Sequence, residues 1–293
     1  RLVGSEMCIR DSTHFVTVIK DGETIMGTAA GTSSEADDED IRLNMHLVYD
    51  FAMTSPIDDL RFILATKDYN MGAAREAIKG NYGHNLGKTI DRPLSQGILG
   101  HSIFSHIIAK TASACDARMG GAMIPVMSNS GSGNQGISAT VPVVIFGRAN
   151  GASHERILRA LALSHLTVIY IKQSLGRLSA LCGCVVAATG SSCGITYLMG
   201  GGYEEITYAV KNMVANLTGM ICDGAKPSCS LKVTSGVATA VLSAVLAIRH
   251  RHTTSLEGII DDDVDRCIRN LTDIGRKGMQ QTDKLILDIM TNK

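Results

Sequence analysis

Three cysteines in the second half of the chain, Cys182, Cys222 and Cys229, have a spacing that suits an iron–sulfur cluster. Cys182 lies near the start of a predicted helix, and residues 223–228 between the other two contain the glycine and proline of a tight loop. Thiolates from one loop and one neighbouring helix can hold a cluster with one iron open as a Lewis acid. Buried structural cysteines are the main alternative. Zinc fits less well, because the chain has no C-x2-C pair.

Four of the five remaining cysteines, all but Cys8, are predicted to be small buried residues rather than ligands. Cys184 and Cys193 are close enough along the chain to replace Cys182, and the sequence leaves that choice open. Cys184 follows Cys182 by two positions, so on a helix it would face another direction. Cys115 and Cys267 stand alone. Because the cysteines cluster and no secretory signal is visible, we expect reduced thiols in a cytoplasmic protein.

A second group of residues with chemical potential is the segment 128–136, SNSGSGNQG. Alternating glycine and hydroxyl residues expose backbone N–H groups and side-chain donors to an anion, and the apolar segment 137–146 would supply a helix whose N-terminal end receives it. A flexible Gly/Ser loop is the alternative, which the density of polar amides between two apolar segments disfavours. We therefore interpret residues 128–136 as a binding loop for a carboxylate or phosphate.

The same loop is compatible with another enzyme class. Ser-Gly-Asn-x-Gly resembles the phosphate-gripping loop of pyridoxal-phosphate-dependent dehydratases. Such an enzyme requires a lysine that forms the Schiff base, and Lys110, inside an apolar predicted helix, is the nearest candidate. A pyridoxal-phosphate-dependent dehydratase therefore stays as an alternative.

Composition restricts the class of protein. The 28 basic and 28 acidic residues give a net charge of zero, which leaves no basic field for nucleic acid or an anionic membrane. Hydrophobic residues make up 45% of the chain and charged residues 19%, as in a soluble globular protein. Aromatic residues make up only 4% while glycine reaches 30 residues, so closely packed helices of small side chains are expected. We expect no nucleic-acid or membrane partner, and the oligomeric state, a homo-oligomer included, stays open.

Helical signals dominate the chain after residue 34, so the fold class is predicted to be mainly α. Residues 35–40 form an acidic helix start, and residues 80–92 are predicted as a Gly/Asn-rich connection. Hydrophobic periodicity predicts helices over residues 41–53, 57–79 with a break near Asn70, 94–114, 153–175, 177–199, 203–217, 230–249, 263–277 and 280–291.

The start of the chain has a different pattern. Residues 14–19 and 24–28 alternate as strands do, and Asp21-Gly22 between them predicts a hairpin. A single hairpin is not stable alone, so residues 13–34, with a linker at 31–34, are interpreted as a β-hairpin remnant of an N-terminal α/β domain. Residues 1–12 do not join this pattern and are interpreted as a non-native scar. Residues 35–293 form the helical cluster-binding domain, and the missing initiator Met suggests a chain that starts within a longer protein.

Several motifs together resemble one family. The motifs DARMGG, MSNSGSGNQGI, LSHL, RLSALC, GMICDGAKPSC and MQQTD are similar to the L-cysteine desulfidase or UPF0597 family, which is related to the iron–sulfur L-serine dehydratase alpha chain. The resemblance runs from about residue 14 to residue 293. It implies a helical catalytic domain of the serine dehydratase alpha-chain type, with a [4Fe-4S] cluster on Cys182, Cys222 and Cys229.

The resemblance also implies a reaction. A lyase of this kind eliminates sulfide from L-cysteine, giving pyruvate and ammonia, or acts on L-serine, and the sequence does not choose between them. Ser130, Ser132, Asn134 and Gln135 would grip the substrate carboxylate while a base removes the α-proton. The base expected for the family lies in a Gly-Cys-Thr-Glu-Pro motif, which this sequence lacks. The catalytic base is therefore unknown, this chain is expected to be inactive alone, and a non-catalytic iron–sulfur or redox module is the alternative.

Two further residues near these motifs have competing interpretations. His165, on the apolar stripe of the predicted helix 153–175, is expected to be a core histidine rather than a catalyst. Lys226, between two of the proposed cluster cysteines, either neutralises the charge of a cluster or lies in solvent.

Overall fold

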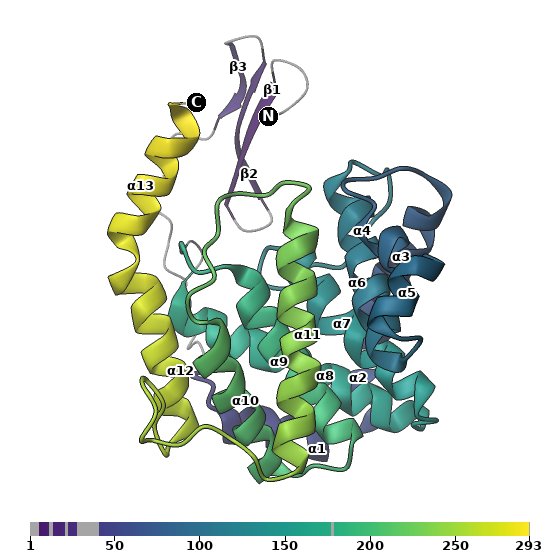
Figure 1. Cartoon of the computed structure of the whole chain (residues 1–293). Helices are drawn as coiled ribbons and strands as arrows, with labels where there is room; N and C mark the ends of the chain where they lie inside the picture. The colour runs from purple at the N-terminus through teal and green to yellow at the C-terminus, as the bar shows by residue number, and fades with distance from the viewer. Residues whose placement is uncertain (1–5, 12–13, 21–22, 28–40, 177–178, 293) are drawn as a thin grey trace. The chain divides into compact units, whose positions relative to one another are not determined.

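Figure 1 shows the computed structural model, which describes residues 6–11, 14–20, 23–27, 41–176 and 179–292. The chain divides into two compact units, residues 1–42 and residues 43–293. The smaller unit holds the described strands, and the larger unit holds the described helices. Helices make up most of the described chain, so the prediction of a mainly α protein is confirmed.

The smaller unit is an antiparallel sheet of β1 (Glu6–Asp11), β2 (His14–Lys20) and β3 (Glu23–Gly27), in that spatial order. β1 pairs with β2, so the prediction that the start of the chain does not join the strands is wrong for residues 6–11. An irregularity in the register at Ile9 interrupts the alternation that would have revealed β1. The described residues give no support for a remnant of an α/β domain. The predicted linker and acidic helix start lie outside the described residues.

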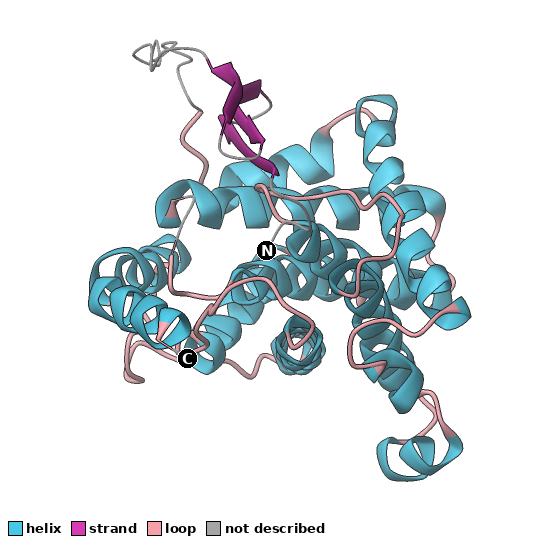
Figure 2. Cartoon of the chain, turned by 90° about the horizontal axis from the view of Figure 1, so that it is seen from above, coloured by secondary structure: helices cyan, strands magenta, loops and turns pink. Residues whose placement is uncertain are grey.

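The larger unit is an assembly of helices that are close to the predicted ones in most cases. Its α-helices are α1 (Met45–Thr54), α2 (Ile57–Leu60), α3 (Leu64–Lys79), α4 (Leu86–Ile90), α5 (Pro93–Leu99), α6 (Ile103–Met119), α7 (Gly133–Ala149), α8 (His154–Leu175), α9 (Gly183–Leu198), α10 (Tyr203–Leu217), α11 (Cys229–Ile248), α12 (Val264–Asp273) and α13 (Gln280–Thr291). A 3₁₀ turn η1 (Arg61–Ile63) and a π-helical turn η2 (Ile274–Gly278) join some of them. Figure 2 shows these helices connected mostly by short loops.

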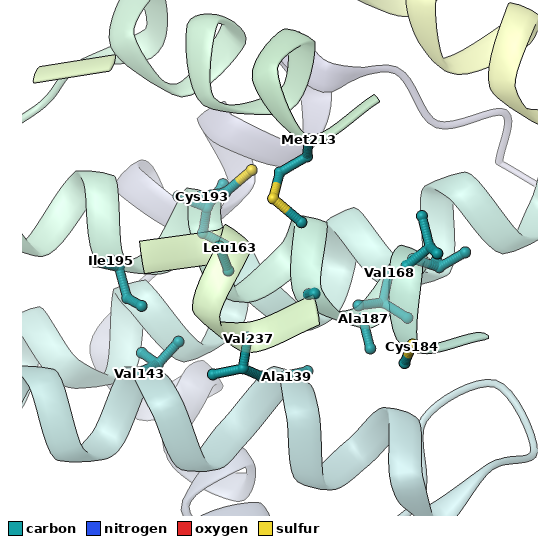
Figure 3. Packing of buried hydrophobic residues seen from close by; sticks show 14 of the residues in the cluster. Ala139, Val143, Leu163, Val168, Cys184, Ala187, Cys193, Ile195, Met213 and Val237 are labelled. Carbon is teal, nitrogen blue, oxygen red and sulfur yellow. The ribbon is translucent and has the colours of Figure 1, made fainter. Parts of the chain in front are cut away.

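Small residues let the central helices approach closely. α9 is almost entirely buried and packs against α7, α8, α10 and α11. A Cβ on Gly190 would lie 2.4 Å from the carbonyl oxygen of Ser164, so the backbones of α8 and α9 are in direct contact. Figure 3 shows the interior around this contact, with Leu163 and Val237 among its buried residues. The predicted core of small, closely packed side chains is confirmed.

Two predicted helices are divided differently from the prediction. The helix predicted over residues 94–114 is split into α5 and α6, because the chain turns at Gly100 with a φ of +76°. The helix predicted over residues 57–79 is interrupted at η1, whereas Asn70 continues α3 without a break. The predicted connection 80–92 contains the short helix α4.

α11 is the one described helix that is long and apolar enough to cross a membrane. Half of its apolar window is buried inside the unit, as in the core helix of a soluble protein. Length and composition alone do not separate these two cases, so α11 is weak evidence for a membrane span.

Candidate functional site

Cys182 and Cys222 are brought together by a short backbone ladder. The N–H of Cys182 donates to the carbonyl oxygen of Met220 at 2.9 Å, and the N–H of Cys222 donates to that of Ala180 at 2.6 Å. An isolated antiparallel bridge joins the residues that precede the two cysteines. Paired strands lie about 5 Å apart, so this ladder holds Cys182 beside Cys222 despite their separation in sequence.

Cys229 returns toward the same place through the loop 223–228. Gly224 has a φ of +89°, which glycine adopts without strain. The N–H of Cys229 donates to the carbonyl oxygen of Lys226 at 2.8 Å and closes the turn. Cys229 then begins α11. The prediction that this loop folds back is confirmed.

The three cysteines line one cavity of about 230 Å³, which we call the thiol pocket. Three helices begin at this cavity, since Ser132 precedes α7, Cys182 precedes α9 and Cys229 is the first residue of α11. Each helix N-terminus carries about half a unit of positive charge. The thiol pocket is therefore electrostatically suited to an anionic group. Its walls also include Arg118, Asn134, Gln135, Gly183, Cys184 and Lys232.

Cys184 belongs to the thiol pocket, contrary to the prediction that it faces elsewhere. Its Sγ lies 3.4 Å from the Sγ of Cys182 and 3.1 Å from the Sδ of Met220. The helical argument failed because Cys182 is the N-cap of α9, with extended backbone angles, and not a residue within the helix. Cys193 is fully buried farther along α9, beside Met213 in Figure 3, and is not among the residues of the thiol pocket. Cys184, and not Cys193, is therefore the cysteine placed to substitute for Cys182.

The thiol of Cys182 contacts those of Cys184 and Cys222, and the thiols of Cys182 and Cys222 resist ionisation. Contact with Cys184 raises the pKa of Cys182 to about 12, and contact with Cys182 raises the pKa of Cys222. A metal centre that binds these groups as thiolates would overcome this resistance to ionisation. Among the described residues, no group of three or more His, Cys, Asp and Glu side chains is arranged around one ion. Cys182, Cys222 and Cys229 nevertheless line one cavity, so the donors that a cluster would need are present in one place.

Two lysines beside the cysteines are engaged by one carboxylate. Lys226 pairs with Asp223 at 2.6 Å, and Lys232 also pairs with Asp223. Both lysines lower the pKa of Asp223 to about 2. Lys226 is therefore held in an ion pair, and of the two lysines it is Lys232 that lines the thiol pocket.

Three of the four predicted substrate-binding residues line the thiol pocket. Ser132 caps α7 by accepting a hydrogen bond from the N–H of Gln135 at 3.4 Å. α7 begins at Gly133 rather than at the predicted residue 137, so Asn134 and Gln135 already lie in its first turn. Gln135 is buried against Gly183, because a Cβ on Gly183 would lie 3.0 Å from the Cδ of Gln135.

Ser130, the fourth predicted residue, lies apart from the thiol pocket. It has a φ of +47°, and its Oγ donates to the Oδ1 of Asn129 at 2.8 Å. Ser130 lines a separate, mainly apolar cavity of about 280 Å³ that also includes Phe62 and His165. The segment 128–136 therefore contributes its two ends to two different cavities.

A buried chain of hydrogen bonds fixes the first part of this segment. The Nδ2 of Asn129 contacts the Nδ1 of His165 at 2.9 Å, and the Nε2 of His165 contacts the Oγ1 of Thr140 at the same distance. Asn70 donates to Thr140 and accepts from the N–H of Met127 at 3.0 Å. His165 is therefore a satisfied core histidine, as predicted, and it helps to hold the loop in place.

This burial makes a prediction for the pH dependence of stability. Burial lowers the pKa of His165 to about 4, whereas an unfolded histidine titrates near 6.5. The unfolded chain then binds a proton more readily, so stability falls as pH decreases from about 6.5 toward about 4, and we expect a loss of about 2 kcal/mol at about pH 5. Urea unfolding at about pH 8 and about pH 5 measures this loss. The His165→Gln variant, which has no proton to gain there, should lose less, and an equal loss would contradict the prediction.

Lys110 lies at other cavities than the two that the 128–136 loop lines. Its Nζ pairs with Asp91 at 2.9 Å, and it lines two other cavities beside His106. The geometry therefore gives no support to the pyridoxal-phosphate alternative, which placed Lys110 at the phosphate-gripping loop.

Sequence reasoning missed Arg118 and Lys232. Lys232 follows Cys229 by three positions on α11, and residues three apart share a helix face, so this signal was available. Arg118 belongs to the DARMGG motif and lies in the last turn of α6, so it enters the thiol pocket from a different part of the chain. Only the fold places it there.

Comparison with known proteins finds relatives over nearly the whole chain. The family model described as serine dehydratase alpha chain matches residues 18–288. A UPF0597 protein of Bacteroides thetaiotaomicron is 63% identical over 281 residues, which are 96% of this chain and 66% of that protein. A UPF0597 protein of Porphyromonas gingivalis is 55% identical over 282 residues, 96% of this chain and 65% of that protein. A UPF0597 protein of Oleidesulfovibrio alaskensis is 43% identical over 286 residues, 97% of this chain and 67% of that protein.

This chain spans about two thirds of the length of the curated relatives it matches. No solved structure matches it. The matched region of the family model includes every residue of the thiol pocket. The resemblance drawn from the motifs is confirmed, and the chain belongs to the serine dehydratase alpha chain family.

Proposed function

We propose that this protein is an iron–sulfur-dependent lyase that acts on a small L-amino acid, either L-serine or L-cysteine. Loss of water from L-serine, or of hydrogen sulfide from L-cysteine, leaves an enamine that one water hydrolyses to pyruvate and ammonia. The thiol pocket carries the proposal, because cysteine thiols, helix N-termini and the polar loop meet there. Membership in the serine dehydratase alpha chain family supports a lyase reaction.

Different residues of the thiol pocket would have different roles in such a reaction. A [4Fe-4S] cluster held by Cys182, Cys222 and Cys229 would supply a Lewis-acidic iron for the leaving group. Ser132 and Asn134 offer hydroxyl and amide groups that orient the substrate. The N-terminal ends of α7, α9 and α11 stabilise negative charge that develops on the substrate as its α-proton leaves.

The proposal does not assign the base that removes the α-proton. None of the described residues that line the thiol pocket is Asp, Glu or His. The relatives are longer than the region matched here, so a test must include one of them. Because the proposed ligands are reduced thiols, we further propose that the protein works in the cytoplasm.

Anaerobic reconstitution tests this function. This chain and the Bacteroides thetaiotaomicron relative are incubated with iron and sulfide, and the bound iron and sulfide are measured. Pyruvate and released sulfide are then assayed with L-serine and with L-cysteine. We expect cluster uptake by both proteins and turnover by the longer relative. Failure of both proteins to take up iron would reject the proposal, and uptake without turnover in the relative would identify a non-catalytic iron–sulfur module.

A further inference from the structure

The thiol pocket contains the guanidinium of Arg118, which has no role in the reaction proposed above. Arg118, at the end of α6, forms no ion pair with a described Asp or Glu. Its Nη1 donates to the Sδ of Met119 at 3.1 Å, and a thioether is a weak acceptor. The nearby carboxylate of Asp116 instead accepts from the N–H of Gly87 at 3.1 Å. Arg118 therefore presents a guanidinium whose strongest available partner is a ligand.

The fold aims this guanidinium at the start of α7. A Cβ on Gly133 would lie 2.3 Å from the Nε of Arg118, so the arginine crosses the first residue of α7 in direct contact. The free N–H groups of that helix end and the guanidinium thus favour the same anion. Two parallel N–H donors on arginine match the two oxygens of a carboxylate.

Two acceptors without partners accompany this donor set. The Oδ1 of Asn134 and the Oε1 of Gln135 are buried and have no hydrogen-bond partner among the described residues. Gln135 is only 6% exposed, and it lines the thiol pocket. A buried amide oxygen without a donor is unfavourable, and an ammonium group supplies up to three donors.

We propose that Arg118 binds the α-carboxylate of the substrate and that Asn134 and Gln135 accept hydrogen bonds from its α-ammonium group. This inference rests on the proposed function for the class of substrate. It adds the groups that select amino acids as substrates, because the thiol pocket recognises both charged ends of a zwitterionic α-amino acid. A ligand that lacks either charged end leaves the guanidinium or the amide oxygens unpaired.

Calorimetric titration of this chain, before and after cluster reconstitution, tests the inference without turnover. The probes are L-serine, L-alanine, which has no leaving group, and L-serinamide, which has no carboxylate. Both amino acids should bind to the wild type. L-serinamide should bind to the wild type roughly 10- to 100-fold more weakly than L-serine does, and L-alanine should bind to Arg118→Gln more weakly than to the wild type by roughly the same factor. Arg118→Lys should bind with intermediate affinity. Arg148→Gln, at the exposed other end of α7, should bind as the wild type does.

The Gly133→Ala variant provides a second test, because it displaces the guanidinium without removing its charge. Its affinity for L-alanine should also fall, with thermal unfolding reporting whether each variant is folded. Wild-type affinity in Arg118→Gln, or no binding of L-alanine by the wild type, would overturn the inference. Carboxylate-dependent binding by this chain, with no pyruvate from the reconstituted longer relative, would reject the lyase proposal alone. Pyruvate from that relative, together with wild-type affinity for L-alanine in Arg118→Gln, would reject this inference alone.

Discussion

The Cys222→Ala variant is expected to lose cluster binding and all activity that depends on it, while it stays folded. Cys222 is partly exposed in a loop beside Cys182, so its replacement removes less packing than that of a fully buried residue. A thiolate removed from a three-cysteine site leaves an iron without its protein ligand, and we expect iron content to fall by roughly tenfold or more. Iron and sulfide per chain after anaerobic reconstitution measure this loss, and circular dichroism confirms the fold.

Cys193→Ala is the matched control for this variant. Cys193 is fully buried in the core and lies outside the thiol pocket, so its replacement costs packing and not ligation. We expect about 1 kcal/mol of lost stability and the iron content of the wild type. Wild-type iron content in Cys222→Ala would contradict the assignment, and Cys184→Ala shows whether the fourth thiol of the thiol pocket shares in it.

The sequence predicted those parts of the thiol pocket whose geometry depends on a short stretch of neighbouring residues. Glycine and proline after Cys222 indicated a loop that folds back, and this loop returns Cys229 to the start of α11. The polar loop was expected to deliver groups to a helix N-terminus, and Ser132 caps α7 as that pattern requires. Such features depend on a few neighbouring residues, so a single sequence contains them.

The sequence did not predict the positions of side chains that depend on contacts between distant parts of the chain. Cys184 enters the thiol pocket because a ladder to residues 220–222 holds Cys182 in extended conformation before α9. Ser130 turns to the other cavity because its backbone is left-handed and Asn129 is tied to His165. Arg118 arrives from α6, whose place beside α7 is a property of helix packing. No spacing within the motifs reports these three facts.

The same distant packing gives the second large expected effect, the destabilisation caused by Gly136→Ala. A Cβ at Gly136 would lie 1.9 Å from the carbonyl oxygen of Met127 and 3.0 Å from the carbonyl carbon of Ser128. Both contacts are with backbone, which cannot rotate away as a side chain can. α7 would have to move away from the segment before the polar loop, at a cost of roughly 3–5 kcal/mol.

Chemical unfolding of Gly136→Ala beside Gly97→Ala isolates this contact. Gly97 lies inside α5, where an added Cβ would meet no atom within 4 Å, so alanine there should leave stability unchanged or raise it by up to about 1 kcal/mol. Because Asn134 and Gln135 lie in the first turn of α7, a shift of this helix also separates them from the cysteines. Gly136→Ala should therefore weaken binding of L-alanine even where the chain still folds. Wild-type stability in this variant would mean that α7 does not contact the backbone of Met127. The positions assigned to the substrate-binding groups in the first turn of α7 would then also be wrong.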